Sequence, residues 1–72
     1  MEEEIIKEIY SSDRSKKVNI IKRLDGRFTY RKQERSGIEW GSETVDSGVY
    51  DSPETAESEA RQRIDWLKRG FN

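Results

Sequence analysis

The chain has 72 residues, of which 40% are charged, with a net charge of only −1, and it contains no cysteine and no histidine. A chain this short forms one domain (residues 1–72) that can hardly enclose an active-site cavity, and it lacks the usual general base, zinc ligands and disulfides, so we expect neither an enzyme nor a bound metal or cofactor. No apolar run follows Met1, which predicts a cytoplasmic protein without a signal peptide or a membrane partner.

Two strands are predicted in the first third of the chain. Residues 2–10 bring three isoleucines and a tyrosine close together and suit either a short helix or a strand. We prefer a strand because the polar connector at residues 11–17 leads directly into another extended segment. That segment, residues 18–24, is rich in β-branched residues and alternates loosely, with Val18 and Ile20 on one side and Asn19 and Ile21 on the other.

The pair Asp25-Gly26 predicts a hairpin turn into a third strand, residues 28–33, and the core decides the length of the loop. A two-residue loop would put the aromatic side chains of the third strand on the face opposite Val18 and Ile20. A three-residue loop, residues 24–26 with Gly26 left-handed, instead places Ile20 across from Tyr30. We expect the three-residue loop, which gives the face toward the helix four members: Val18, Ile20, Phe28 and Tyr30.

A fourth strand is predicted after a second turn. Residues 34–37 form that turn, and residues 38–45 form the strand, with Trp40 on the side that faces the helix. A loop at residues 46–48 and a short extended link at Val49 and Tyr50 then lead to the start of the helix.

One helix is predicted from about Pro53 to Lys68. Ser52 supplies a capping hydroxyl, Pro53 occupies the first turn, where its missing N–H costs nothing, and Gly70 supplies a stop. The apolar positions form one narrow stripe: Ala56, Ala60, Ile64, Leu67 and Phe71. No other helix is available to cover this stripe. We therefore predict an α+β fold, in which an antiparallel meander of three to four strands has one C-terminal α-helix packed across one face.

The small net charge hides two blocks of opposite sign. Residues 14–35 hold nine basic and two acidic residues, whereas residues 36–59 hold seven acidic residues and no basic one. Basic strands that lie beside acidic ones would pair across the sheet. The alternative is a positive face that binds phosphate. On that interpretation the candidate nucleic-acid or anion contacts are Arg23, Arg27 and Arg31 on the outer face of the hairpin and Lys16 and Lys17 in the nearby loop.

Trp66 is the candidate protein contact. On a regular helix it lies about 110° from the centre of the apolar stripe, too far round to reach the middle of the sheet. Its ring either covers Ile5, Ile9 or Tyr10 at a sheet edge, or it is an exposed anchor for a second copy or another protein.

The sequence at residues 50–56, Tyr-Asp-Ser-Pro-Glu-Thr-Ala, followed by Asp-Trp-Leu at residues 65–67, resembles a family of small bacterial proteins of unknown function. The resemblance covers most of the chain. Compared with the family, this chain is shorter between strands three and four and richer there in Arg and Lys. It implies a cytoplasmic sheet-plus-helix domain and carries over no catalytic or binding residue. The layout is also similar to the three-strand-and-helix DNA-binding domains of plant transcription factors and some phage integrases. Those domains read DNA with the face that here carries Arg23, Arg27 and Arg31.

Two functional classes follow. The first is a non-enzymatic protein-interaction or self-association module, with a protein partner or a homodimer, because small size, exposed aromatic candidates and open sheet edges favour it. The alternative is a nucleic-acid-binding accessory domain that uses the basic sheet face.

Overall fold

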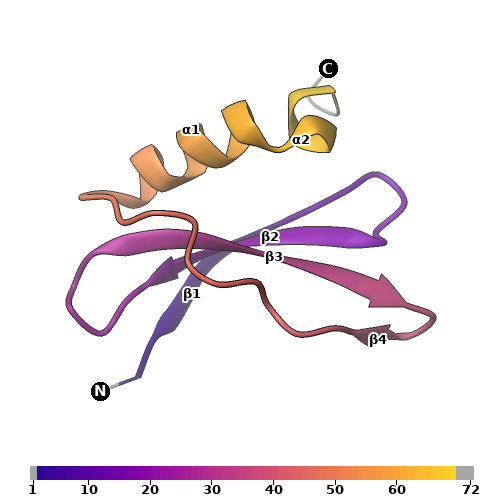
Figure 1. Ribbon diagram of the computed structural model, residues 1–72, viewed down its shortest axis with the longest axis horizontal. Helices are drawn as coiled ribbons and strands as arrows, with labels where there is room; N and C mark the ends of the chain where they lie inside the picture. Colours follow the sequence, from indigo (N-terminus) through magenta and orange to yellow (C-terminus); the bar gives the residue numbers. More distant parts are fainter. Residues whose placement is uncertain (1, 70–72) are drawn as a thin grey trace.

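The computed structural model describes residues 2–69 and places a curved sheet beneath a helical segment (Figure 1). The elements run in the order β1 (Glu4–Tyr10), β2 (Lys16–Lys22), β3 (Phe28–Ser36), β4 (Glu39–Trp40), α1 (Pro53–Arg63) and α2 (Asp65–Arg69). The strands are antiparallel neighbours in chain order, which makes the sheet a meander. The predicted α+β fold is therefore confirmed, including the strand at the N-terminus. Within residues 2–69 no helix is long and apolar enough to span a membrane. Gly70 and Phe71 lie outside the described residues.

The β2–β3 hairpin has the predicted three-residue loop. Ile20 lies opposite Tyr30 and Lys22 opposite Phe28. Gly26 has a left-handed backbone (φ +85°), which a residue without Cβ adopts at no steric cost. The last bond before the loop runs from the Arg23 N–H to the carbonyl oxygen across the hairpin, at 2.7 Å. This register places Val18, Ile20, Phe28 and Tyr30 on the face toward α1 and Ile21 on the opposite face.

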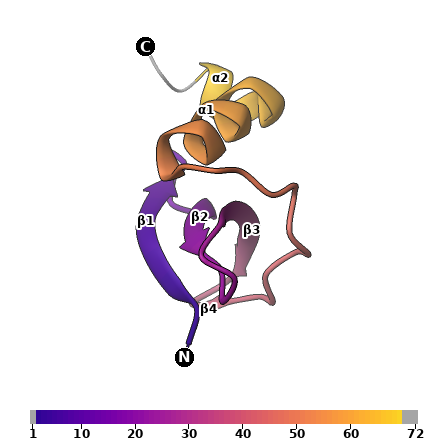
Figure 2. The ribbon, with the colours of Figure 1, turned by 90° about the vertical axis from the view of Figure 1, so that its left-hand side faces the viewer.

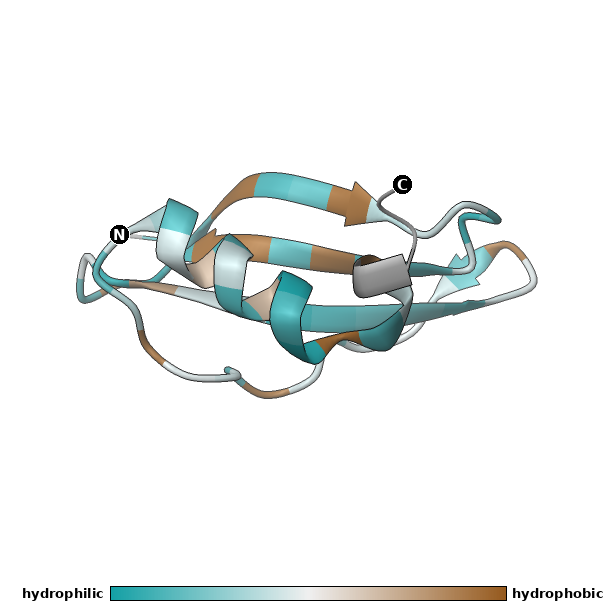
Figure 3. Cartoon of the chain, turned by 90° about the horizontal axis from the view of Figure 1, so that it is seen from above, coloured by the Kyte–Doolittle hydropathy of each residue, from teal (hydrophilic) through white to brown (hydrophobic). Residues whose placement is uncertain are grey.

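The core lies between this face and the helices. Figure 3 shows α1 over β2 and β3, with apolar stretches of β2 beneath it. Small side chains on α1 allow the helix to approach the sheet closely, and larger ones fill the end near α2. The buried members of the core are Val18, Ile20, Tyr30, Ala56, Ala60, Ile64 and Leu67, and Ile9, Phe28, Tyr50 and Trp66 pack against them at its margin.

The predicted single helix from Pro53 to Lys68 is interrupted. Its start is as expected, because the Ser52 side chain accepts a hydrogen bond from the backbone N–H of Thr55 at 3.1 Å. α1 ends at Arg63, and Ile64 is extended (φ −98°, ψ +114°) before α2 begins. The break brings Trp66 against the core, although a continuous helix would direct it about 110° away from the stripe. Packing of this last turn therefore outweighs the continuation of the helix.

The predicted turn at residues 34–37 and strand at residues 38–45 are both largely wrong. β3 continues to Ser36, the turn lies at Gly37 and Ile38, and only Glu39 and Trp40 of the predicted fourth strand are extended in the sheet. Residues 41–50, here called the strap, follow the edge of β3 through isolated hydrogen bonds (Figure 2). The backbone N–H groups of residues 41, 44, 47 and 50 donate to the carbonyl oxygens of residues 34, 32, 30 and 28. The strap thus uses three residues where β3 uses two, so a regular ladder cannot form.

Trp40 lies on the outer face, the side of the sheet opposite α1, and not on the predicted helix-facing side. It pairs with Arg35, whose side chain follows those of Arg31 and Gln33 on that face. The tight turn at Gly37 (φ +66°) sets this register, which fixes the face on which Trp40 lies.

Candidate functional site

Arg31, one of the predicted nucleic-acid contacts, is ion-paired within the molecule. Its guanidinium donates hydrogen bonds to Glu3 at 2.9 and 3.0 Å, to Asp46 at 2.6 Å and to Glu43 at 3.3 Å. The bonds to Glu3, followed by those to Asp46 and Glu43, raise the pKa of Arg31 despite its partial burial. A guanidinium with three carboxylate partners has little left to offer a phosphate.

The other two arginines of the predicted face differ from each other. Arg23 lies 3.3 Å from a carboxylate oxygen of Asp25 and 3.5 Å from one of Asp46. Arg27 is exposed, and no carboxylate within residues 2–69 forms an ion pair with it. The three arginines therefore form no shared positive surface.

The centre of the outer face is closed by polar side chains. Asn19 is fully buried and donates to Gln33 at 2.9 Å and to Glu43 at 2.6 Å, while its Oδ1 atom has no partner. Its neighbours Ile21 and Thr29 are buried as well. This part of the face is not accessible to the backbone of a nucleic acid.

A cluster of aromatic and basic side chains lies at the other end of the outer face, where the β1–β2 loop meets β4. The rings of Tyr10 and Trp40 meet edge to face, with centroids 5.9 Å apart. The Lys17 ammonium lies 4.7 Å from the Trp40 centroid and 5.6 Å from that of Tyr10. The guanidinium of Arg14 lies 5.2 Å from the Tyr10 ring and that of Arg35 lies 5.8 Å from the Trp40 ring. We call these five residues the aromatic-basic cluster.

The sheet register brings the members of this cluster together. Tyr10 is the last residue of β1 and lies opposite Lys17, and Trp40 lies opposite Arg35. Arg14 has a left-handed backbone (φ +60°) in the β1–β2 loop. The loop is held by the Asp13 carboxylate, whose pKa falls to about 2 because it accepts hydrogen bonds from the backbone and side chain of Ser15 and from the side chain of Ser11.

The charge of the cluster is positive on balance. Among residues 2–69, the carboxylate that forms a hydrogen bond or ion pair with the cluster is that of Glu8, which accepts from the Tyr10 hydroxyl at 2.9 Å and from Lys17 at 3.4 Å. Arg14 and Arg35 are exposed, and within residues 2–69 neither forms an ion pair. Cations held against ring faces gain about 0.5–1 kcal/mol at exposed sites, little enough for a ligand to displace them.

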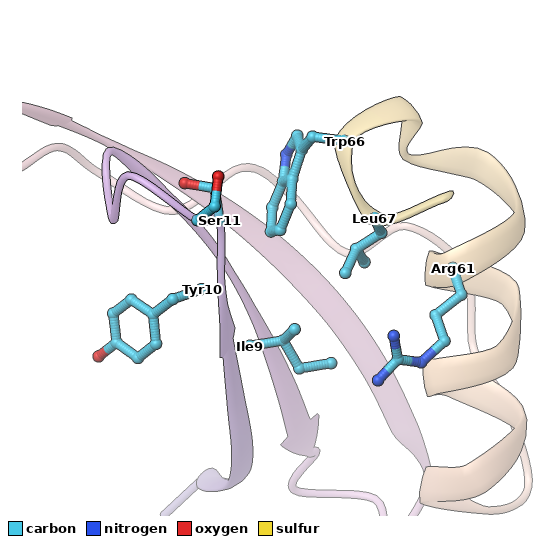
Figure 4. Close-up of a pocket in the computed structure, with 7 residues that line it drawn as sticks. Ile9, Tyr10, Ser11, Arg61, Trp66 and Leu67 are labelled. Carbon is cyan, nitrogen blue, oxygen red and sulfur yellow. The ribbon is translucent and has the colours of Figure 1, made fainter. Parts of the chain in front are cut away.

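Trp66 lies beside a cleft of about 320 Å³ between the end of β1 and the helices (Figure 4). The ring is half-buried against the core and covers the end of β1, near Ile9. The ring of Tyr10 points away from Trp66 and Leu67 (Figure 4) and meets the Trp40 ring of the aromatic-basic cluster. Of the two alternatives for Trp66, the structure shows the one in which its ring covers a sheet edge. A role of Trp66 as a protein contact stays a prediction.

Lys16 and Lys17, predicted as contacts in a loop, are instead the first two residues of β2. Lys17 lies in the cluster, whereas Lys16 is exposed on the opposite face of the sheet, across from Glu34. The structure separates both from the hairpin arginines. Sequence reasoning missed Tyr10, Arg35 and Trp40 as site residues. Arg35 and Trp40 could have been found from the sequence by placing a tight turn at Gly37. Such a turn pairs Arg35 with Trp40 across the two strands. Comparison of the chain with protein-family models, curated proteins and solved structures found no match.

Proposed function

We propose that this protein is a non-enzymatic module that binds single-stranded nucleic acid at the aromatic-basic cluster. The observation that carries the proposal is the convergence of three basic side chains from three segments on one aromatic pair, of which only Lys17 forms an ion pair within residues 2–69. Proteins that bind single strands combine aromatic platforms for bases with cations for phosphates. The cluster contains both parts within one surface.

Binding would use the cluster as follows. Bases stack on the rings of Tyr10 and Trp40, and the guanidinium groups of Arg14 and Arg35 move from the ring faces to the phosphates. Lys17 is buried along most of its length and stays in place as a fixed positive charge. Stacking needs unpaired bases, so a single strand fits this surface better than a duplex.

Fluorescence anisotropy of a labelled oligothymidine or oligouridine at two salt concentrations tests the proposal. Neutralisation of about three phosphates predicts a slope of log K against log salt near −2. Arg14→Gln/Arg35→Gln removes two of these phosphate contacts and should weaken binding about tenfold and flatten the slope by about 1.4. Trp40→Ala should remove the stacking of one base, which is worth about 1–3 kcal/mol.

The matched control is Lys22→Gln/Arg27→Gln, which removes two exposed positive charges at the opposite end of the sheet. This variant has the same net charge as the first and should bind like the parent. The proposal fails if the parent does not bind at low salt, or if the two double variants lose affinity equally.

A second candidate function is self-association, for which the open edge of β1 is the supporting observation. We also propose that the protein is cytoplasmic and that it belongs to the small bacterial family that its sequence resembles. A nucleic-acid ligand fits a protein inside the cell, and the meander with its helical segment is the fold that the resemblance implies.

A further inference from the structure

Within residues 2–69, no strand pairs with the outer side of the β1 backbone. β1 is the first strand of the sheet, and six of its seven residues pair with β2 on the other side (Figure 2). The opposite edge of the sheet is different, because the strap covers β3. An uncovered strand of this length is a template for pairing with another chain.

The side chains of β1 are apolar at positions that the helix does not cover. α1 packs on β2 and β3, and Ile5 and Ile6 are 51% and 44% exposed. The register shifts between Ile5 and Lys7, so Ile6 is an extra, bulged residue. As a result, Ile6 and Lys7 both lie on the face toward the helix, while Ile5 and Glu8 lie on the outer face.

This arrangement of side chains on the two faces of β1 is compatible with pairing to β1 of a second copy of the chain. In an antiparallel pair related by a two-fold axis, residues directly opposite each other must lie on the same face. Among registers centred within residues 6–8, only an axis between Ile6 and Lys7 meets this condition along the strand. It pairs Glu4 with Ile9, Ile5 with Glu8, and Ile6 with Lys7 of the other copy.

The charges agree with this register. Each Lys7 lies diagonally across from Glu4 of the other copy, on the helix-facing side, and no like charges lie directly opposite each other. Within one copy Lys7 already bonds to Glu57 of α1 at 3.1 Å, so its ammonium would join two carboxylates. Closure by a two-fold axis uses both β1 edges and stops at two copies.

We infer that two copies of this chain pair through β1 and join their sheets into one continuous antiparallel sheet. The inference rests on self-association, the second candidate function, and is independent of nucleic-acid binding. Ile5 and Ile6 of each copy then lie against the partner strand and not against water.

Sedimentation velocity from about 10 μM to about 1 mM tests the inference, because dimerisation must increase with concentration. Ile6→Lys places a charge on the edge and should leave a monomer over the whole range. Ile38→Lys is the control, since Ile38 is 93% exposed in the β3–β4 turn, and this variant should dimerise like the parent. A parent that stays monomeric contradicts both self-association and the pairing. A dimer that Ile6→Lys leaves intact supports self-association but overturns pairing through β1.

The register has its own test because the chain contains no cysteine. A mixture of the Ile5→Cys and Glu8→Cys proteins should form a disulfide-linked dimer faster than either protein alone. Equal rates in the mixture and in the separate proteins would contradict the register, even if Ile6→Lys fails to fold.

Discussion

The two faces of the sheet are closed in different ways. On the helix-facing side Val18 and Ile20 pack against the alanines of α1, whereas on the outer side Asn19 and Thr29 are equally buried but polar. The outer face is held by hydrogen bonds and ion pairs around Arg31. The first face depends on apolar burial, which is insensitive to pH, and the second depends on ionised carboxylates. Substitutions should therefore affect the two faces by different amounts and under different conditions.

The largest effect is expected on the helix-facing side. Ile64→Ala or Leu67→Ala removes a buried side chain from the end of the core and should lower the free energy of unfolding by about 2–4 kcal/mol, enough to unfold much of so small a domain. Urea denaturation followed by circular dichroism measures this loss. Melting like that of the parent would show that these residues do not hold the helix on the sheet.

A smaller effect is expected on the outer face. Arg31→Gln leaves Glu3, Glu43 and Asp46 without their shared partner and should cost about 2 kcal/mol, the value of a lost hydrogen bond to a charged group. Arg27→Gln is the control and should be close to neutral, since Arg27 is exposed. Equal losses in the two variants would mean that the network around Arg31 does not hold the strap.

The helix start should contribute less than either face. Ser52→Ala frees the backbone N–H of Thr55 and should cost about 1 kcal/mol, whereas Ser58→Ala, at an exposed position within α1, should be neutral or slightly stabilising. Thermal melting of both variants separates the effect of the cap from that of helix propensity. A loss in Ser58→Ala that equals the loss in Ser52→Ala would contradict this role of the cap.

Acid should weaken the outer face by the smallest amount. The hydrogen bond from Arg31 holds the pKa of Glu3 below its ordinary value of 4.5. The fold therefore favours the ionised form, and this contribution is present above pH 4.5 and is lost as the pH falls below it. Arg31→Gln should abolish the loss of stability that is due to Glu3. The contribution of Asp13 to stability should remain in this variant, and it is lost only as the pH approaches the Asp13 pKa of about 2. Identical acid denaturation profiles of the parent and Arg31→Gln would contradict the assignment.

The hairpin and the helix start were predictable from the sequence because local rules determine them. The Asp25-Gly26 turn, together with the requirement for one apolar face, determined the register of β2 and β3, and Ser52 with Pro53 marked the start of α1. The break at Ile64 was not predictable, since it depends on how Trp66 packs against β1. The strap was missed because its spacing of three residues to two matches no regular strand pattern.

The site was only partly predictable for the same reason. Patterns of alternation showed that Arg23 and Arg31 share the outer face, but they could not show that the strap would bring Glu43 and Asp46 to the same place. The face on which Trp40 lies depends on the register across a tight turn, in which a shift by one residue moves every side chain to the other face. Composition and alternation do not determine that register.

Chemical-shift mapping by nuclear magnetic resonance during titration with a single-stranded oligonucleotide tests the central claim most directly, because it locates the ligand on the sheet. Perturbed signals at the aromatic-basic cluster, including the indole N–H of Trp40, with little change at Arg23, Arg27 and Arg31, are the result that we predict. Perturbation centred on these three arginines, with the signals of Tyr10 and Trp40 unchanged, would contradict it.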